Sequence, residues 1–322
     1  RGARQVGRST LVRQFCQAEG YDLMEINLEK RRILDLVFQK NDVSLAVREI
    51  EALLSRSIGP KSLLFLDEVQ DAPHALPLLR YFHEERPELP VIAAGSLLEF
   101  VLSDHDFSMP VGRLEYRFLG PLTFREYLAA KNENFLLEAL ESFNLKKITD
   151  FSPTLHAKAV ELHREYLFIG GMPEAMQAAL NQGVPSDAVG VHKSIMEVYQ
   201  DDFVRYTKRN SLLLMHQVFD YLAARPCQKI KYSNIDSSRP AKEIHKCLEL
   251  LFHARVATPI FHSNCSAQPL ALQVKNKVYK SLFLDVGLVN YASHISWSTF
   301  RQRTQSELLS EGALAEQVVG QA

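Results

Sequence analysis

The sequence contains little that would tie it to a membrane or to an oxidising compartment. No stretch of the 322 residues approaches the roughly 18 consecutive apolar residues of a transmembrane helix. The four cysteines (Cys16, Cys227, Cys247 and Cys265) form no CxxC pair and lie at no zinc-ligand spacing with histidine. We therefore expect a reduced, cytoplasmic chain. Hydrophobic residues make up 46% of the chain and charged residues 23%, which excludes collagen, a disulfide mini-protein and a mostly disordered chain.

Neither sign of charge is in excess overall, because 37 Lys and Arg nearly balance 38 Asp and Glu and leave a formal net charge of −1, but the charges are unevenly spread. Residues 204–280 contain 13 Lys and Arg against 4 Asp and Glu, a formal charge of +9, which leaves −10 for the remainder. This asymmetry indicates that one part of the chain meets a polyanion. The alternative is a basic face that docks on the acidic part of the same chain.

The first 130 residues alternate apolar runs with helical patterns, which predicts an α/β fold with a parallel sheet and helices on both faces. We expect strands at 21–29, 62–68, 90–96 and 115–122, and helices at 45–55 and 75–85.

From about residue 123 the strand signal fades and long helical patterns follow. From residue 210 the pattern changes and predicts a helix at 212–224, then a short helix and a second long helix. Ser238 would cap that helix, with Pro240 in its first turn. Strand-like runs follow at 255–261 and 270–274. Helix, short helix, helix and hairpin is the order of a winged helix-turn-helix.

The strongest chemical signal is the segment GARQVGRST, which fits the phosphate-binding pattern GxxxxGK[ST] except at Arg8. Glycines let the backbone wrap a phosphate chain, and the helix that follows adds its dipole. Ser9 would place its hydroxyl on Mg²⁺. We expect ATP to be bound by Gly2, Ala3, Arg4, Gln5, Val6, Gly7, Arg8, Ser9 and Thr10.

Two acidic residues end the apolar run LLFLDE. A buried strand that ends in acids places them where α/β sheets bind ligands. Asp67 would then hold Mg²⁺ through water, and Glu68 would polarise the attacking water as general base. The next apolar strand ends at Ser96, which would reach the γ-phosphate or that water. The alternative for Asp67 and Glu68 is a solvated strand end, and the alternative for Ser96 is a turn residue. The order and spacing of the three features together favour an ATPase core.

Seven segments occur in an order typical of one family: GARQVGRSTLVRQF, INLE, LLFLDEVQ, AAGSLLEF, GRLEYRFLGPLTFREYL, FIGGMPEAM and SLFLDVGL. In these segments the chain resembles the prokaryotic AAA+-type P-loop ATPases with a C-terminal domain of unknown function. In that family a winged helix precedes a restriction-endonuclease-like core. The resemblance implies ATP and Mg²⁺ binding at the Walker A segment, Walker B roles for Asp67 and Glu68, and a sensor role for Ser96.

The resemblance also implies four segments. These are a P-loop ATPase core at 1–128, a helical lid-like segment at 129–203, a basic winged helix at 204–300 and the start of a nuclease-like domain at 301–322. The phosphate loop begins at the second residue, where the family has a strand ahead of it, and the last segment stops within a helical pattern, so we expect a fragment truncated at both ends. Glu316 would match the first acidic position of the nuclease-like core. The later acids of that core are missing, so no nuclease activity is expected of this chain.

The roles of two arginines, Arg8 and Arg113, do not follow directly from the family pattern. The family has lysine in place of Arg8, whose longer planar fork cannot sit as a point charge between the phosphates. We expect binding to survive this change and hydrolysis to suffer. Arg113 lies in the GR pair that follows the sensor strand in the family, where it would stabilise transition-state charge. A salt-bridged surface arginine fits Arg113 equally well.

Basic side chains on and beside the expected recognition helix suit contacts with nucleic acid: Arg239, Lys242, His245 and Lys246. Glu243 and Glu249 dilute this patch, and a protein partner is the alternative. We predict an ATPase that couples Mg²⁺-dependent hydrolysis to a conformational change, with no membrane partner and an open oligomeric state. The alternative function is a nucleotide-binding module that docks DNA or protein without efficient hydrolysis.

Overall fold

The computed structural model describes residues 1–95, 112–146, 151–207, 211–266, 268–303 and 312–322. The chain divides into two compact units, Arg1–Leu119 and Gly120–Ala322. The four segments predicted from the sequence are a finer division, which stays a prediction. In the described ranges, no helix combines the length and apolar character needed to cross a lipid bilayer.

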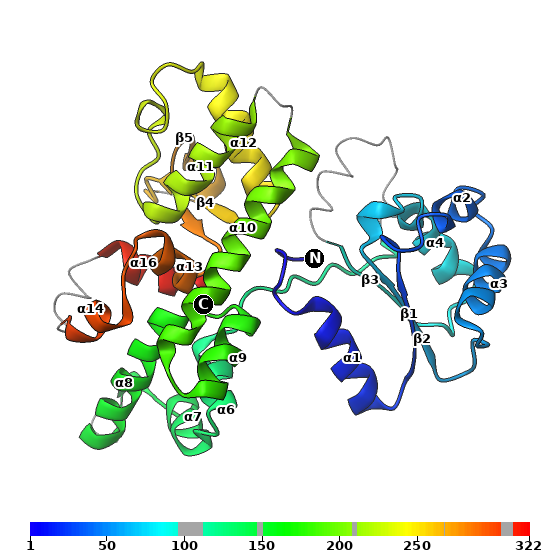
Figure 1. The fold of residues 1–322 in the computed structure, drawn as a ribbon, viewed down its shortest axis with the longest axis horizontal. Helices are drawn as coiled ribbons and strands as arrows, with labels where there is room; N and C mark the ends of the chain where they lie inside the picture. Colours follow the sequence, from blue (N-terminus) through cyan, green and yellow to red (C-terminus); the bar gives the residue numbers. More distant parts are fainter. Residues whose placement is uncertain (96–111, 147–150, 208–210, 267, 304–311) are drawn as a thin grey trace. The chain divides into compact units, whose positions relative to one another are not determined.

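The first unit is built on a three-stranded parallel sheet in the order β1-β2-β3, which confirms the predicted α/β class (Figure 1). In the register, Asp22 lies opposite Ser62, and Leu66 lies opposite both Ile26 and Ala93. The elements in chain order are α1 (Arg8–Glu19), β1 (Asp22–Asn27), α2 (Leu34–Phe38), α3 (Val43–Leu54), β2 (Ser62–Asp67), the 3-10 turn η1 (Val69–Asp71), α4 (Ala75–Glu85) and β3 (Val91–Ala93).

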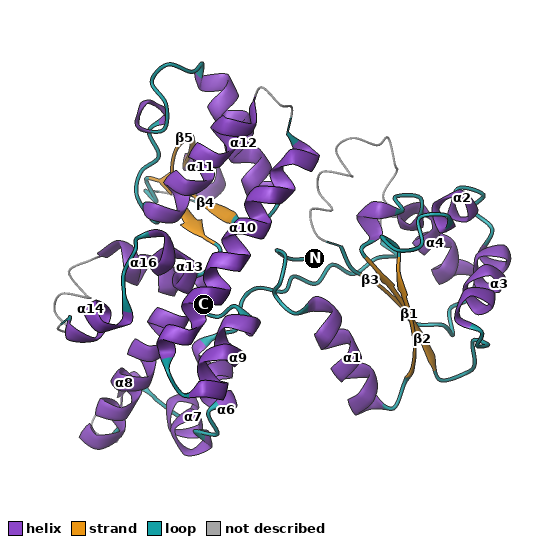
Figure 2. Cartoon of the chain, in the orientation of Figure 1, coloured by secondary structure: helices purple, strands orange, loops and turns teal. Residues whose placement is uncertain are grey.

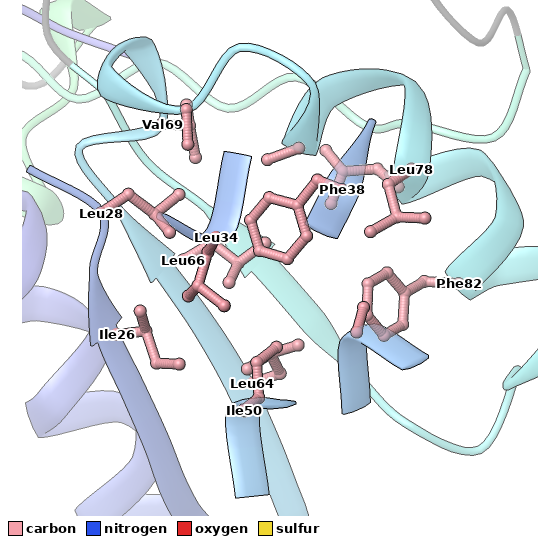
Figure 3. Packing of buried hydrophobic residues seen from close by; sticks show 14 of the residues in the cluster. Ile26, Leu28, Leu34, Phe38, Ile50, Leu64, Leu66, Val69, Leu78 and Phe82 are labelled. Atoms are coloured by element: carbon pink, nitrogen blue, oxygen red, sulfur yellow. The ribbon is translucent and has the colours of Figure 1, made fainter. Parts of the chain in front are cut away.

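Strand β2 is buried along its whole length because helices cover both faces of the sheet. Successive side chains of a strand point to opposite faces. Leu64 and Leu66 therefore join the larger core, formed with α2, α3 and α4, where Phe38 and Phe82 pack (Figure 3). Leu63 and Phe65 point to the other face and pack against Val12 and Cys16 of α1. The continuous apolar run in the sequence thus marks a central strand that ends at Asp67.

The second unit is largely helical, with one two-stranded antiparallel sheet (Figure 2). Its first part contains α6 (Phe124–Ala130), α7 (Asn134–Glu141), α8 (Pro153–Ile169), α9 (Pro173–Gln182), η3 (Pro185–Asp187) and α10 (Ala188–Tyr206). Its second part contains α11 (Leu212–Ala224), η5 (Tyr232–Asn234), α12 (Ala241–His253), β4 (Ala257–Ser263), η6 (Leu270–Gln273), β5 (Val274–Phe283), α13 (Val286–Ala292), α14 (Trp297–Gln302) and α16 (Gly312–Gln321).

A fully buried carboxylate, Asp285, connects several elements of the second unit. It accepts hydrogen bonds from the backbone N–H of Gly171 (2.7 Å), the N–H of Gly287 (2.9 Å) and Nε2 of Gln321 (2.8 Å). Burial raises the pKa of Asp285, while these donors oppose the rise. Nearby, Nε2 of the buried His192 lies 2.8 Å from the carbonyl oxygen of Ile169. The motifs GGMP and LFLDVG therefore form part of the core of this unit.

Helix α16 is attached by two glutamine side chains placed four residues apart. The amide of Gln317 bonds both backbone groups of Phe283, accepting from its N–H at 2.9 Å and donating to its carbonyl at 2.7 Å. Gln321 accepts from the N–H of Val286 at 2.9 Å, while its Nε2 bonds Asp285. Side-chain amides thus satisfy main-chain groups that a neighbouring strand would otherwise bond.

Three local predictions are wrong. Residues 115–122 form no strand, because only Leu119 forms a bridge, a parallel one with Gly2. Ser238 does not cap α12, because its hydroxyl donates to Asp236, and Pro240 lies at the N-cap instead of inside the first turn. Residues 270–273 form a 3-10 turn after Pro269, so the strand begins only at Val274.

Candidate nucleotide site

The phosphate loop turns sharply through residues with unusual backbone angles. Gln5 has φ 61° and Gly7 has φ 89°, and α1 begins at the next residue, Arg8. Gly2 lies so close to the segment ahead of α6 that a Cβ atom would lie 2.3 Å from the carbonyl oxygen of Leu119. The first glycine of the motif is thus required for space and the second for its left-handed conformation.

The other loop residues divide into a buried group and an exposed group. Ala3 and Val6 are 3% exposed and anchor the loop, whereas Gln5 and Thr10 are exposed. Arg4 is half-buried. The contact of each of these residues with nucleotide stays a prediction.

The hydroxyl of Ser9 donates to Oδ2 of Asp67 at 2.7 Å. Ser9 lies in the first turn of α1, and Asp67 is the last residue of β2. The fold therefore brings together the two residues that the sequence predicts to hold Mg²⁺. A serine hydroxyl and a carboxylate are hard oxygen donors of the kind that Mg²⁺ takes, with water completing its shell. The two side chains thus fit this ion.

Asp67 is only 5% exposed, and burial raises the pKa of its carboxyl group. The hydrogen bond from Ser9 lowers this pKa, the negative charge of Glu68 raises it, and the positive charge of Arg8 lowers it. A dication beside Asp67 would favour the ionised carboxylate.

Arg8 bonds two carbonyl oxygens. Its Nη1 lies 2.6 Å from the oxygen of Gly2 and 2.7 Å from that of Gly95, the second residue after β3. The guanidinium thus joins the start of the phosphate loop to the end of the neighbouring strand. A lysine has one compact ammonium in place of this planar fork, so the two residues are not equivalent here.

Glu68 follows Asp67 at the point where β2 ends, in a left-handed conformation with φ 54°. Its Oε2 accepts a hydrogen bond of 2.6 Å from Nε2 of Gln70. Non-glycine residues adopt this conformation at a cost, and such residues cluster at functional sites. The sequence pattern predicts a role for Glu68 and none for Gln70, although Gln70 lies in the same segment, LLFLDEVQ, two residues after Glu68.

For two further predicted site residues, Ser96 and Arg113, the structure gives no support for a catalytic role. Ser96 lies outside the described residues, so its sensor role stays a prediction. Arg113 is described, and its Nε lies 3.4 Å from Oε1 of Glu84, with 45% of its side chain exposed. This contact matches the salt-bridged alternative, and the catalytic role of Arg113 stays a prediction.

The basic residues around α12 differ in their surroundings. Arg239 pairs with Glu243 at 3.4 Å, and His245 pairs with Glu249 at 3.3 Å. Two other side chains, Lys242 and Lys246, are exposed on the same helix. Ile244, Cys247, Leu248 and Leu251 are buried, so the lysines lie on the solvent side.

Glu316 of α16 pairs with Lys280 of β5 at 2.6 Å. Among the described residues, no group of three or more His, Cys, Asp and Glu side chains is placed to hold a metal ion. The role that the resemblance implies for Glu316 stays a prediction.

Comparison with known families supports the assignment of the first unit. Residues 1–128 match the family described as an AAA domain, and residues 160–299 match a domain of unknown function (DUF8612). No curated protein matches the chain. The N-terminal part is therefore an AAA-type, P-loop ATPase-like domain, and such a domain is a nucleotide-binding one.

Proposed function

We propose that the protein binds ATP with Mg²⁺ and hydrolyses it to ADP and phosphate. The observation that carries this proposal is the 2.7 Å hydrogen bond between Ser9 and Asp67, which joins a phosphate loop to a strand that ends in acids. The match of residues 1–128 to an AAA domain supports it.

The roles proposed for the chain's own groups follow from their positions. Residues 2–10 bind the phosphates through backbone N–H groups and the N-terminus of α1. Ser9 would hold Mg²⁺ directly and Asp67 would hold it through water, and the ion would supply positive charge against the phosphates. Glu68 accepts a proton from the attacking water. Ser96 and Arg113 keep the sensor and charge-stabilising roles proposed from the sequence.

The experiment that tests this proposal measures phosphate release by the wild-type protein, Glu68→Gln and Arg8→Lys. Glu68→Gln should retain ATP affinity and lose roughly 10²-fold or more in turnover, the contribution of one general base. Glu85→Gln, an exposed glutamate on α4, is the matched control. Equal turnover in wild type and Glu68→Gln would remove Glu68 from the mechanism.

A second candidate function is a nucleotide-binding module without efficient turnover. The observation that favours it is Arg8, whose guanidinium bonds the carbonyl oxygens of Gly2 and Gly95. If this arrangement limits hydrolysis, Arg8→Lys should hydrolyse ATP faster than wild type. If both proteins bind ATP and neither releases phosphate, the binding function is supported instead.

We also propose that part of the second unit is a winged helix that contacts nucleic acid. The helices α11 and α12, the turn η5 between them and the β4–β5 hairpin support this proposal. A bridge between Lys229 and Lys280 adds a third short segment to the hairpin. Exposed Lys242 and Lys246 on α12 would contact phosphates.

A further inference from the structure

The amide of Gln70 lies between Glu68 and the end of β3. Its Nε2 donates to Oε2 of Glu68 at 2.6 Å and to Oδ2 of Asp71 at 3.3 Å. The opposite orientation of the amide would turn its oxygen toward these two carboxylates, where neither can donate. The orientation of Gln70 is therefore set by the acids beside it.

The oxygen of the same amide is buried and has no hydrogen-bond partner among the residues that the structure describes. It points at Gly95, where a Cβ atom would lie 2.6 Å from Oε1. The backbone is fixed on both sides of this contact, because the N–H of Val69 donates to Ala94 and Arg8 bonds the oxygen of Gly95. Buried acceptors are normally hydrogen-bonded, so this oxygen needs a hydrogen-bond donor from a water or a ligand.

We infer that Gln70 positions the attacking water in the proposed ATPase reaction, so this inference rests on the proposed function. Nε2 holds the carboxylate of Glu68, and Oε1 accepts one hydrogen of the water. Glu68 accepts the other hydrogen. With both hydrogens held by acceptors, a lone pair of the water is directed to the γ-phosphorus.

In this reaction the water oxygen forms a bond to the γ-phosphorus, and the bond from that phosphorus to the bridging oxygen breaks. The electron pair leaves with ADP, and the proton of the water goes to Glu68. Glu68 then releases the proton to solvent or to phosphate. Gln70 exchanges no proton and is a positioning residue.

Gly95 gives this inference a second, independent variant. An alanine at this position would place its Cβ 2.6 Å from Oε1 of Gln70 and 3.0 Å from Cγ2 of Val69. The amide of Gln70 would have to move, while the carbonyl that bonds Arg8 would remain. Gly95→Ala should therefore reproduce the loss caused by removing the amide.

The experiment measures turnover and ATP affinity in wild type, Gln70→Leu, Gly95→Ala and the double variant. We expect Gln70→Leu and Gly95→Ala each to lose roughly 10- to 10²-fold in turnover, with ATP affinity and the melting temperature nearly unchanged. The double variant should lose no more than either single variant, because both remove one interaction. Gln17→Leu on the exposed face of α1 is the matched control and should match wild type.

Three outcomes would overturn the inference. If Gln70→Leu keeps full turnover while Glu68→Gln loses it, Gln70 has no positioning role and the ATPase function stands. If turnover falls together with ATP affinity or melting temperature, Gln70 is a structural residue. If wild type binds ATP without hydrolysing it, both the inference and the hydrolytic part of the proposed function fail.

Discussion

Gly287 lies directly against the carbonyl oxygen of Ile169, and a Cβ atom on this glycine would come within 2.3 Å of that oxygen. The same Cβ would lie 2.8 Å from Nε2 of His192. Because the nearest neighbour is backbone in the core, it has little room to move. The approach of α13 to the end of α8 therefore depends on the missing side chain.

Gly287→Ala should destabilise the second unit by about 1–3 kcal/mol, because it overpacks a rigid backbone contact. The matched control is Gly190→Ala in α10, where a Cβ would meet nothing within 4 Å. That change should stabilise the unit by roughly 0.5–1 kcal/mol through helix propensity. Urea unfolding can be followed by the fluorescence of Trp297, the single tryptophan, which packs on Phe168. Equal stability of the two variants would contradict this prediction.

Ser9→Ala should weaken Mg²⁺-dependent nucleotide binding about 10-fold, since it removes an ion ligand and a hydrogen bond to a buried carboxylate. Gln14→Ala changes an exposed residue of α1 outside the phosphate loop and is the control. Calorimetry with ATP in the presence and absence of Mg²⁺ would measure the effect. A loss of the same size without Mg²⁺, or in Gln14→Ala, would show that Ser9 does not act through the ion.

The unfolding free energy of the second unit should decrease as the pH is lowered below about 6.5. Burial lowers the pKa of His163, which packs edge-on against Phe124 with 4.9 Å between ring centroids. The unfolded chain therefore binds a proton before the folded chain does, so the stabilising contribution is complete above the unfolded pKa and is lost as pH falls. Burial of His192 adds a change of the same sign.

For His163 alone the slope is at most about 1.4 kcal/mol per pH unit, the value for one proton. His163→Phe should reduce the pH dependence of the unfolding free energy between pH 7 and 5. His156→Phe, at an exposed position on α8, should leave it unchanged. A pH dependence identical in wild type and His163→Phe would contradict the prediction.

Binding of duplex DNA, if it occurs through α12, should weaken steeply with salt because each phosphate contact releases a counterion. Changing Lys242 and Lys246 to alanine should flatten the log–log slope by about one unit for each lost contact. Lys193→Ala, an exposed lysine on α10, is the control. Absence of binding even at low salt would assign the basic patch to domain docking or solubility.

The sheet of the first unit could be predicted because its central strand is apolar on both faces and ends in acids. β2 was expected at 62–68 and spans Ser62–Asp67, and α4 has the predicted bounds, Ala75–Glu85. The pairing of Ser9 with Asp67 follows from the same pattern, because the motif places both residues at one end of the parallel sheet.

Other features depend on contacts that no local pattern encodes. Serine is a common helix cap, but the hydroxyl of Ser238 donates a hydrogen bond to Asp236 instead. The two carbonyl bonds of Arg8 require the chain to bring Gly95 beside Gly2. In the sequence Gln70 is an ordinary polar residue. Only its orientation between Glu68 and Gly95 makes it a candidate for positioning the attacking water.

The attachment of α16 has a consequence for synthesis on the ribosome. Gln317 and Gln321 are synthesised 34 to 36 residues after their partners Phe283, Val286 and Asp285. Until α16 emerges, the carboxylate of Asp285 lacks one of its donors. The core around Asp285 is therefore completed only when α16 leaves the exit tunnel. The three strands that the structure describes in the first unit are synthesised by Ala93, so they can pair much earlier in translation.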